Sequence, residues 1–264
     1  MIIRQSEPFS TGYNSITELD GKHSEMLMDF GILKLNAGGV DVNEEQKERA
    51  YLLISGEVVF KWLGNEVTAK RENCFDYYPW CLHVPAGVKV EIESLQDGTE
   101  VAVTKTLNEK SFTPKLYLPE ECRSEQRGKG TMKETSTRTV RTIFDYSNAK
   151  DSNLVLGEVI DHPGKWSSYP PHHHPQPEIY FYKFYPENGF GYSEVGENVL
   201  KVRQNDTVKI TEGMTHPQTT APGYAMYYLW VIRHLDGNPY IQPIFVPEHL
   251  WVTDEKAVIW PDKK

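Results

Sequence analysis

The chain has 264 residues, and its 39% hydrophobic and 12% aromatic content suffices for a packed core in one large or two moderate domains. Its net charge of −9 disfavours nucleic acid and anionic membranes as partners, because both bind positive surfaces, whereas a small anionic substrate needs only local cations. No apolar run approaches the ~18 residues that cross a bilayer. The three cysteines form no CxxC pair, and the first residues lack the apolar segment of a secretory signal, so we expect reduced thiols and a cytoplasmic location.

Short β-branched and aromatic runs, separated by Gly, Pro, Asn and Asp, recur along the chain. In the first half they cover residues 49–62, 80–94 and 99–107. In the second half they cover residues 178–185, 198–210, 224–232 and 238–246. This spacing predicts an all-β sandwich or barrel. Helical periodicity is scarce, and the best short helix candidates are residues 43–49 and 119–126.

A polar segment separates the two strand-rich halves. Residues 123–141 contain six basic and two acidic side chains and almost no apolar ones. This composition is typical of a solvated linker or a mobile flap, and it predicts a first domain at 1–122, a connecting segment at 123–142 and a second domain at 143–264. A functional interpretation is that Arg138 or Arg141 meets an anionic ligand, because guanidinium groups suit carboxylates.

The two halves share a weak internal repeat. The stretch HVPAGVKV around Gly87 resembles KITEGMTH around Gly213, and ERAYLLISG from Glu48 resembles EIYFYKFY from Glu178. The pattern suggests a duplicated β-domain in which only the second copy binds metal. On this alignment the first copy lacks the histidines, at the pairs Val42/His172, Glu44/His174 and Val90/His216.

Three histidines and a glutamate in the second half have the spacing of a metal site. His172 and His174 are two positions apart, so on a strand both imidazoles project from one face while His173 points away. Glu178 would lie about 13 Å further along a straight strand, too far to share an ion. The prolines in residues 175–177 argue against a helix, so the workable geometry is a strand, a bend, and a second strand starting at Glu178. A fourth ligand, His216, follows a strand and a Gly turn.

Three neutral imidazole nitrogens and one carboxylate suit a divalent ion such as Zn, Mn, Fe(II), Co or Ni, with open positions left for substrate. The alternatives that involve no metal are a surface histidine cluster and an ordinary core histidine at position 216. The sequence does not choose among the metals.

This spacing resembles the two sequence motifs of the cupins, with the four ligand positions intact. Over nearly the full chain, GKWSSYPPHHH, EIYFYKF, APGYAMYYLWV, PEHLWV and ERAYLLISGEV resemble the 5-deoxy-glucuronate isomerase family of myo-inositol catabolism. The resemblance implies a bicupin, that is, two cupin-type β-barrels of which only the C-terminal one binds metal. It also implies a metal-dependent aldose–ketose isomerase that forms 5-dehydro-2-deoxy-D-gluconate. In this chain, His173 stands where the family usually has Lys.

An isomerisation of this kind needs a group that moves a proton, unless the hydrogen moves as a hydride. The candidate proton carriers are Glu178, which we favour, Tyr182 and Tyr169. Most of the fifteen tyrosines are expected to be packing residues. The candidate partners of the substrate carboxylate are Lys183, Arg203, Arg141 and Arg233. Each of these cations could equally be an ordinary solvent-facing charge.

Other functions fit the same ligands. A bicupin dioxygenase would use them with Fe(II) or Cu and require O2, and a related ketol-isomerase would act on 5-keto-4-deoxyuronates. A non-catalytic sugar-binding cupin would not need four intact ligands. We expect a small anionic sugar acid as partner, and neither nucleic acid nor membrane. Exposed barrel edges would allow a homodimer.

Overall fold

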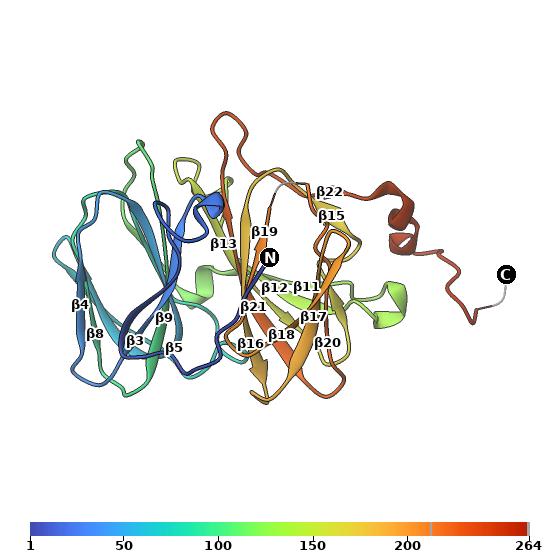
Figure 1. The fold of residues 1–264 in the computed structure, drawn as a ribbon, viewed down its shortest axis with the longest axis horizontal. Helices are drawn as coiled ribbons and strands as arrows, with labels where there is room; N and C mark the ends of the chain where they lie inside the picture. Colours follow the sequence, from blue (N-terminus) through green and yellow to red (C-terminus); the bar gives the residue numbers. More distant parts are fainter. Residues whose placement is uncertain (212, 263–264) are drawn as a thin grey trace.

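The computed structural model describes residues 1–211 and 213–262, and it consists almost entirely of β-structure arranged as two curved halves side by side (Figure 1). The first half is built from β2 (Gly12–Thr17), η1 (Ser24–Met26), β3 (Asp29–Leu35), β4 (Val40–Asn43), β5 (Glu48–Trp62), β6 (Asn65–Arg71), β7 (Cys81–Val84), β8 (Val90–Ser94), β9 (Thr99–Thr106) and β10 (Lys115–Tyr117). Here β denotes a strand and η a short 3-10 helix.

The second half takes in the start of the chain and everything after residue 118. Its elements are β1 (Ile2–Ile3), η2 (Pro119–Glu121), β11 (Arg123–Arg127), η3 (Met132–Glu134), β12 (Arg138–Phe144), β13 (Leu154–Asp161), β14 (Trp166–Ser167), β15 (His172–His173), β16 (Glu178–Tyr185), β17 (Phe190–Val195), β18 (Asn198–Arg203), β19 (Thr207–Ile210), β20 (Gln218–Thr220), β21 (Ala225–Arg233), β22 (Ile244–Phe245) and η4 (Pro247–Thr253). None of the helices in the described ranges is long and apolar enough to span a bilayer.

The sheets of the two halves have corresponding strand orders. The first half follows β10-β7-β5-β9-β3-β2, with β4, β6 and β8 continuing from the far end of the long strand β5. The second half follows β1-β19-β16-β21-β13-β12-β11, and β14-β20-β17-β18 forms a second sheet. The central strand β5 starts at Glu48 and β16 starts at Glu178, which is the pairing that the sequence repeat predicts.

Side-chain alternation gives the main sheet of the second half two different faces. Along β16, Ile179 and Phe181 point toward the first half and pack with its Phe30 and other apolar side chains in one shared core. Tyr180 and Tyr182 point the other way, into the interior of the second half. Glu178 shares this inward parity, and the inward face is where the candidate site lies.

The segment expected to connect two domains, residues 123–142, belongs to the second sheet instead. It forms β11 and most of β12, and β12 pairs with β13 along its length. Its polar composition reflects the exposed edge strand β11 rather than a linker. Likewise β1 pairs with β19, so the start of the chain lies in the sheet of the second half. Strand pairing alone does not define folding units, so the division into domains at 1–122 and 143–264 stays a prediction.

Neither expected helix forms as a regular helix. Residues 43–49 join β4 to β5, and residues 119–126 contain only the single turn η2 before β11 begins. In the first place the chain pairs as strands β4 and β5 of the first half, and in the second β11 pairs with β12, so strand pairing overrides the local helix preference.

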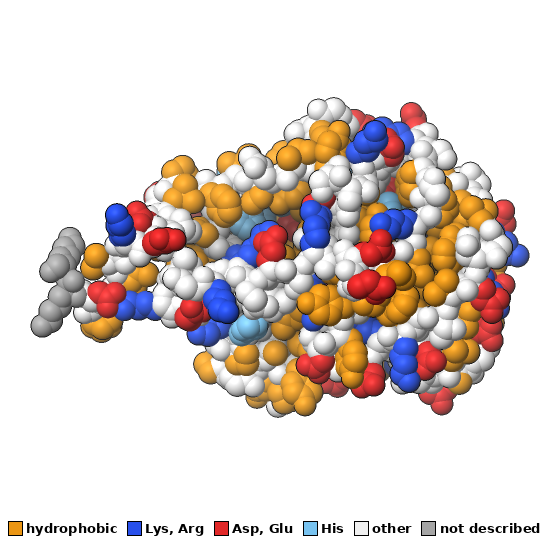
Figure 2. All heavy atoms as spheres, turned by 180° about the vertical axis from the view of Figure 1, so that it is seen from behind, with side chains coloured by type: hydrophobic (Ala, Val, Ile, Leu, Met, Phe, Trp, Pro, Cys, Tyr) orange, Lys and Arg blue, Asp and Glu red, His pale blue; other side chains and the backbone are white. Residues whose placement is uncertain are grey.

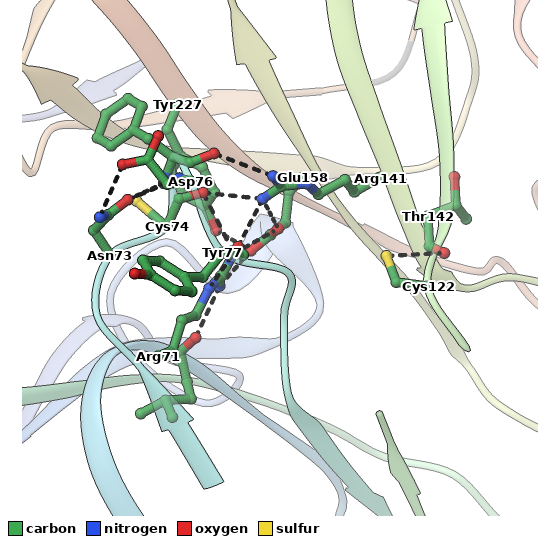
Figure 3. Close-up of polar contacts among 12 residues, drawn as sticks. Arg71, Asn73, Cys74, Asp76, Tyr77, Cys122, Arg141, Thr142, Glu158 and Tyr227 are labelled. Atoms are coloured by element: carbon green, nitrogen blue, oxygen red, sulfur yellow. Dashed lines mark hydrogen bonds and ion pairs between the residues drawn. The ribbon is translucent and has the colours of Figure 1, made fainter. Parts of the chain in front are cut away.

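A buried ion cluster joins the two halves (Figure 3). Arg71 of β6 donates from Nη1 and Nη2 to the two carboxylate oxygens of Glu158 on β13, at 2.7 and 2.9 Å, and both side chains are fully buried. The Tyr227 hydroxyl donates to the same carboxylate at 2.7 Å. Arg141 lies 3.6 Å from it and donates to the Cys74 carbonyl of the first half. Charges from both halves therefore meet in a buried interface, where two guanidinium groups share one carboxylate.

Candidate metal centre

The bend predicted from the proline spacing is present. The short strand β15 ends at His173, a turn covers residues 175–177, and β16 begins at Glu178. This return brings His174 Nε2 to 3.0 Å from Glu178 Oε2. His216, in the loop between β19 and β20, places its Nε2 at 3.4 Å from the same oxygen.

Backbone carbonyls hold all three candidate histidines by their Nδ1 atoms. His172 Nδ1 lies 3.2 Å from the Pro170 carbonyl, His174 Nδ1 3.0 Å from the Gln176 carbonyl, and His216 Nδ1 2.9 Å from the Met214 carbonyl. Nδ1–H donation to a carbonyl leaves the Nε2 lone pair free, which is the usual support of a metal-binding imidazole. The Nε2 of His216 is buried and has no hydrogen-bond partner among the described residues. A divalent ion would satisfy this nitrogen.

The donor atoms of His174, Glu178 and His216 all lie within 4.8 Å of one another, and all three side chains are buried. His172 is outside this tight group but adjacent to it, with its ring centroid 4.7 Å from that of His216. The residues present fit a divalent ion, with three donors in place and His172 beside them. Zn, Mn and Fe(II) all take such a donor set.

Burial keeps the imidazoles of His172 and His216 neutral. It lowers the pKa of His216 to about 3, against a smaller opposing effect of Glu178. It also lowers the pKa of His172 to about 4, and the Pro170 carbonyl opposes this shift. Neutral imidazole is the form that binds a metal, so the protein holds these side chains ready at neutral pH.

The metal-free protein should become less stable as the pH falls from 7.5 to 5.5. A histidine whose pKa is lowered by folding stays neutral in the native state, while the unfolded chain takes up a proton below about pH 6.5. Each such histidine then costs about 1 to 1.5 kcal/mol of stability over this interval. Urea unfolding of chelator-treated protein at several pH values measures the loss. In His216→Gln the free energy of unfolding should depend less steeply on pH, by the contribution of one histidine. An unchanged slope in that variant would contradict the lowered pKa of His216.

A cavity of about 530 Å³ opens onto the histidines, a size suited to a small ligand. Its wall includes His172, His174 and Glu178, the hydroxyl residues Ser167, Ser168, Tyr169, Tyr180, Tyr228 and Tyr240, and the cations Arg127 and Arg138. The hydroxyls are linked, since Ser168 Oγ lies 3.2 Å from both Tyr180 and Tyr228 and Ser167 contacts Tyr228. The cavity therefore offers hydroxyl groups and positive charge beside the candidate metal ligands.

Of the three predicted proton carriers, two reach this cavity. Glu178 and Tyr169 line it, whereas Tyr182 does not. Tyr182 shares the inward face with Glu178 but lies deeper, where its hydroxyl donates to Gln218 Oε1. Its burial raises the pKa of this tyrosine well above the usual range. Tyr182 is a core residue in this structure.

None of the four cations predicted to bind the substrate lines the cavity. Lys183 has the opposite parity to Glu178, so it points to the first half and pairs with Glu100. Arg141, on β12, also points toward the first half and lies in the interface cluster. Arg203 is exposed at the end of β18, and Arg233 ends β21, where Nη1 lies 3.3 Å from Asp236. A role of these four in substrate binding stays a prediction.

Strand parity is the signal that separates Arg138 from Arg141. On β12 the inward positions are Arg138, Val140 and Thr142, and all three line the cavity. The sequence alone did not show that residues 138–144 form a strand. Tyr228, inward on β21, was hidden among the packing tyrosines for the same reason.

Two barrels, of which the second gathers histidines and a glutamate beside a cavity, define the class of bicupins. Solved structures agree with this fold. A deletion mutant of Bacillus subtilis oxalate decarboxylase matches with a TM-score of 0.66 at 12% identity, over 95% of this chain and 80% of that one. An IolB-like protein from Salmonella typhimurium LT2 matches with a TM-score of 0.85 at 22% identity, over 95% and 98%. The expected all-β bicupin fold is confirmed.

The sequence comparison is more specific. The model of the KduI/IolB family matches residues 1–252, and the chain belongs to this family. A 5-deoxy-glucuronate isomerase from Geobacillus kaustophilus is 32% identical over 201 residues, which is 67% of each chain. One from Bacillus subtilis strain 168 is 28% identical over 248 residues, covering 86% of this chain and 89% of its own. The family resemblance seen in the sequence is confirmed.

Proposed function

We propose that this protein is a metal-dependent aldose–ketose isomerase that converts 5-deoxy-D-glucuronate into 5-dehydro-2-deoxy-D-gluconate. Two kinds of observation support the proposal. The family relatives with this activity in their names match most of the chain. Within the chain, the carrying observation is the group of His174, Glu178 and His216 donor atoms at a cavity lined with hydroxyls.

We assign the metal to His172, His174, Glu178 and His216, with Zn, Mn or Fe(II) as the candidates. The ion would supply a Lewis acid that stabilises the negative charge developing on the oxygens of C1 and C2. The chain's own contribution is to hold the imidazoles by their Nδ1 atoms and to bury the site, so that the site needs little rearrangement when charge develops.

The isomerisation moves a hydrogen from C2 to C1 and the hydroxyl hydrogen from O2 to O1. We assign the carbon-bound proton to Glu178, whose carboxylate lines the cavity, with Tyr169 as the second candidate. The linked hydroxyls of Ser168, Tyr180 and Tyr228 offer donors and acceptors for the remaining sugar hydroxyls.

The protein loaded with Mn or Zn should convert 5-deoxy-D-glucuronate into the ketose, with product identity established by NMR. In deuterated water, transfer through Glu178 incorporates deuterium at the carbon that was C1 of the substrate, which is C6 of the product, whereas a hydride shift does not. Turnover should continue without O2, which separates the isomerase from a bicupin dioxygenase. No conversion by a metal-loaded, folded sample would contradict the proposed function.

Four further properties remain predictions. The family description joins two names, so the same assay should include a 5-keto-4-deoxyuronate as the competing substrate. The three cysteines are free thiols in the structure and fit a reducing cytoplasm. Acidic and basic side chains are interspersed over the face in Figure 2, which suits a small substrate rather than a nucleic acid. The fourth is a homodimer joined through exposed barrel edges.

A further inference from the structure

Arg138 is a buried cation inside the cavity. Its side chain is 7% exposed and projects from the inward face of β12. Nη1 donates to the Ser136 carbonyl at 2.8 Å and to its hydroxyl at 2.9 Å, and Nη2 donates to the Tyr169 carbonyl at 3.0 Å. These contacts hold the guanidinium in place with neutral acceptors alone.

The charge of Arg138 is not balanced by a carboxylate. Within residues 1–211 and 213–262 no ion pair involves it, whereas the neighbouring cations Arg141 and Lys183 each face a glutamate. Asp161 lies opposite Arg138 in the strand register, but neither of its oxygens has a partner in the described chain. Burial raises the pKa of Asp161 well above its usual range, against a smaller opposing effect of Arg138. A buried, fixed and unneutralised guanidinium favours an anion.

The spacing between Arg138 and the metal ligands suits a sugar acid. The guanidinium contacts the Tyr169 carbonyl, and the next carbonyl, that of Pro170, lies 3.2 Å from His172 Nδ1. Neighbouring carbonyls of one chain segment therefore hold both groups, and Arg138 and His172 line the same cavity. A six-carbon chain extends roughly 6 Å from C1 to C6, which fits within a cavity of about 530 Å³. The linked hydroxyls of Ser168 and Tyr228 also line the cavity.

We propose that Arg138 binds the carboxylate of the substrate and thereby makes the site specific for aldoses that carry an acid at C6. The inference rests on the proposed function and deepens it. The carboxylate accepts hydrogen bonds from the guanidinium at one end of the cavity, which leaves C1 and C2 facing the histidines. Arg138 is thus a substrate-binding residue that orients the sugar.

The test compares two substrates and three variants of the full-length, metal-loaded protein. The substrates are 5-deoxy-D-glucuronate and its neutral counterpart, which has a hydroxymethyl group in place of the carboxylate. Arg138→Gln should lower kcat/KM for the acid by about 100-fold, mainly through KM, and change the neutral sugar by less than about threefold. Arg138→Lys should recover part of the loss, because it restores the charge. Arg203→Gln, an exposed arginine outside the cavity, should stay within about twofold of the parent.

An equal loss for both sugars, or activity of Arg138→Gln on the acid within threefold of the parent, would overturn the assignment. If the parent does not isomerise 5-deoxy-D-glucuronate at all, the proposed function fails and the inference is tested by binding. Calorimetric titration of the metal-loaded protein with glucuronate and with glucose then decides. Binding of glucuronate that Arg138→Gln abolishes supports the anion site, and equal binding of the two sugars sinks it.

Discussion

His216→Ala is expected to abolish isomerase activity, by roughly 10³-fold or more, and to remove most of the bound metal while the fold persists. The reason is local. His216 Nε2 is buried without a hydrogen-bond partner among the residues that the structure describes, and it lies 3.4 Å from Glu178 Oε2, the oxygen that also contacts His174. Alanine leaves a polar gap beside His174 and Glu178, and two remaining donors in the tight group hold a divalent ion poorly. Metal content by elemental analysis and turnover by NMR measure both losses, and far-UV circular dichroism reports the fold.

His173→Ala is the matched control, because it lies between two of the ligands. His173 belongs to β15 but is not part of the cavity wall, so its removal should leave the metal content unchanged. Its pairing with Ile244 uses backbone atoms, which alanine retains. Full activity in His216→Ala, or loss of metal in His173→Ala, would show that the ligand assignment is wrong.

The local geometry of the site could be predicted from the sequence, because it depends on the two-residue repeat of a strand and on the prolines that interrupt it. A period of two places His172 and His174 on one side, and the prolines turn the chain so that Glu178 returns to them. The distant candidate ligand, His216, was predicted from its place after a strand and a Gly turn. The repeat predicted that β5 and β16 hold equivalent places in the two sheets, and they do. The first half keeps only Glu48 of the set, and that carboxylate lies 2.7 Å from His83 and accepts a bond from Asn153.

The cations could not be assigned in this way, because their roles depend on which face of which strand they occupy. Lys183 is one residue from Tyr182 in sequence but faces the other half of the molecule, where Glu100 meets it. Arg138 and Arg141 lie in a segment whose polar composition hides a strand, and three positions separate inward from outward. Burial and pairing, which only the three-dimensional sheet defines, distinguish the interface cation from the cavity cation.

Glu158→Gln is expected to destabilise the protein by about 3 to 5 kcal/mol, the largest stability effect of any single charge removal considered. Glutamine keeps the size of the side chain but removes the charge that faces both Arg71 and Arg141 in the dry interface of Figure 3. Two guanidinium groups then lose their counter-charge at a place where water does not reach. Because Glu158 points toward the first half and the cavity opens on the opposite face of the same sheet, the fraction that remains folded should keep its turnover. Urea unfolding followed by circular dichroism gives the free energy of unfolding.

Lys70→Gln provides the comparison on the strand that carries Arg71. Lys70 pairs with Glu57 at 3.2 Å, but its side chain is 59% exposed, so the loss should stay below about 1 kcal/mol. The difference between the two ion pairs follows from strand parity on β6. Lys70 faces solvent, and the next residue, Arg71, faces the interface where it meets Glu158. Equal losses in Glu158→Gln and Lys70→Gln would mean that water enters the interface and that shared apolar packing, rather than the buried charges, holds the halves together.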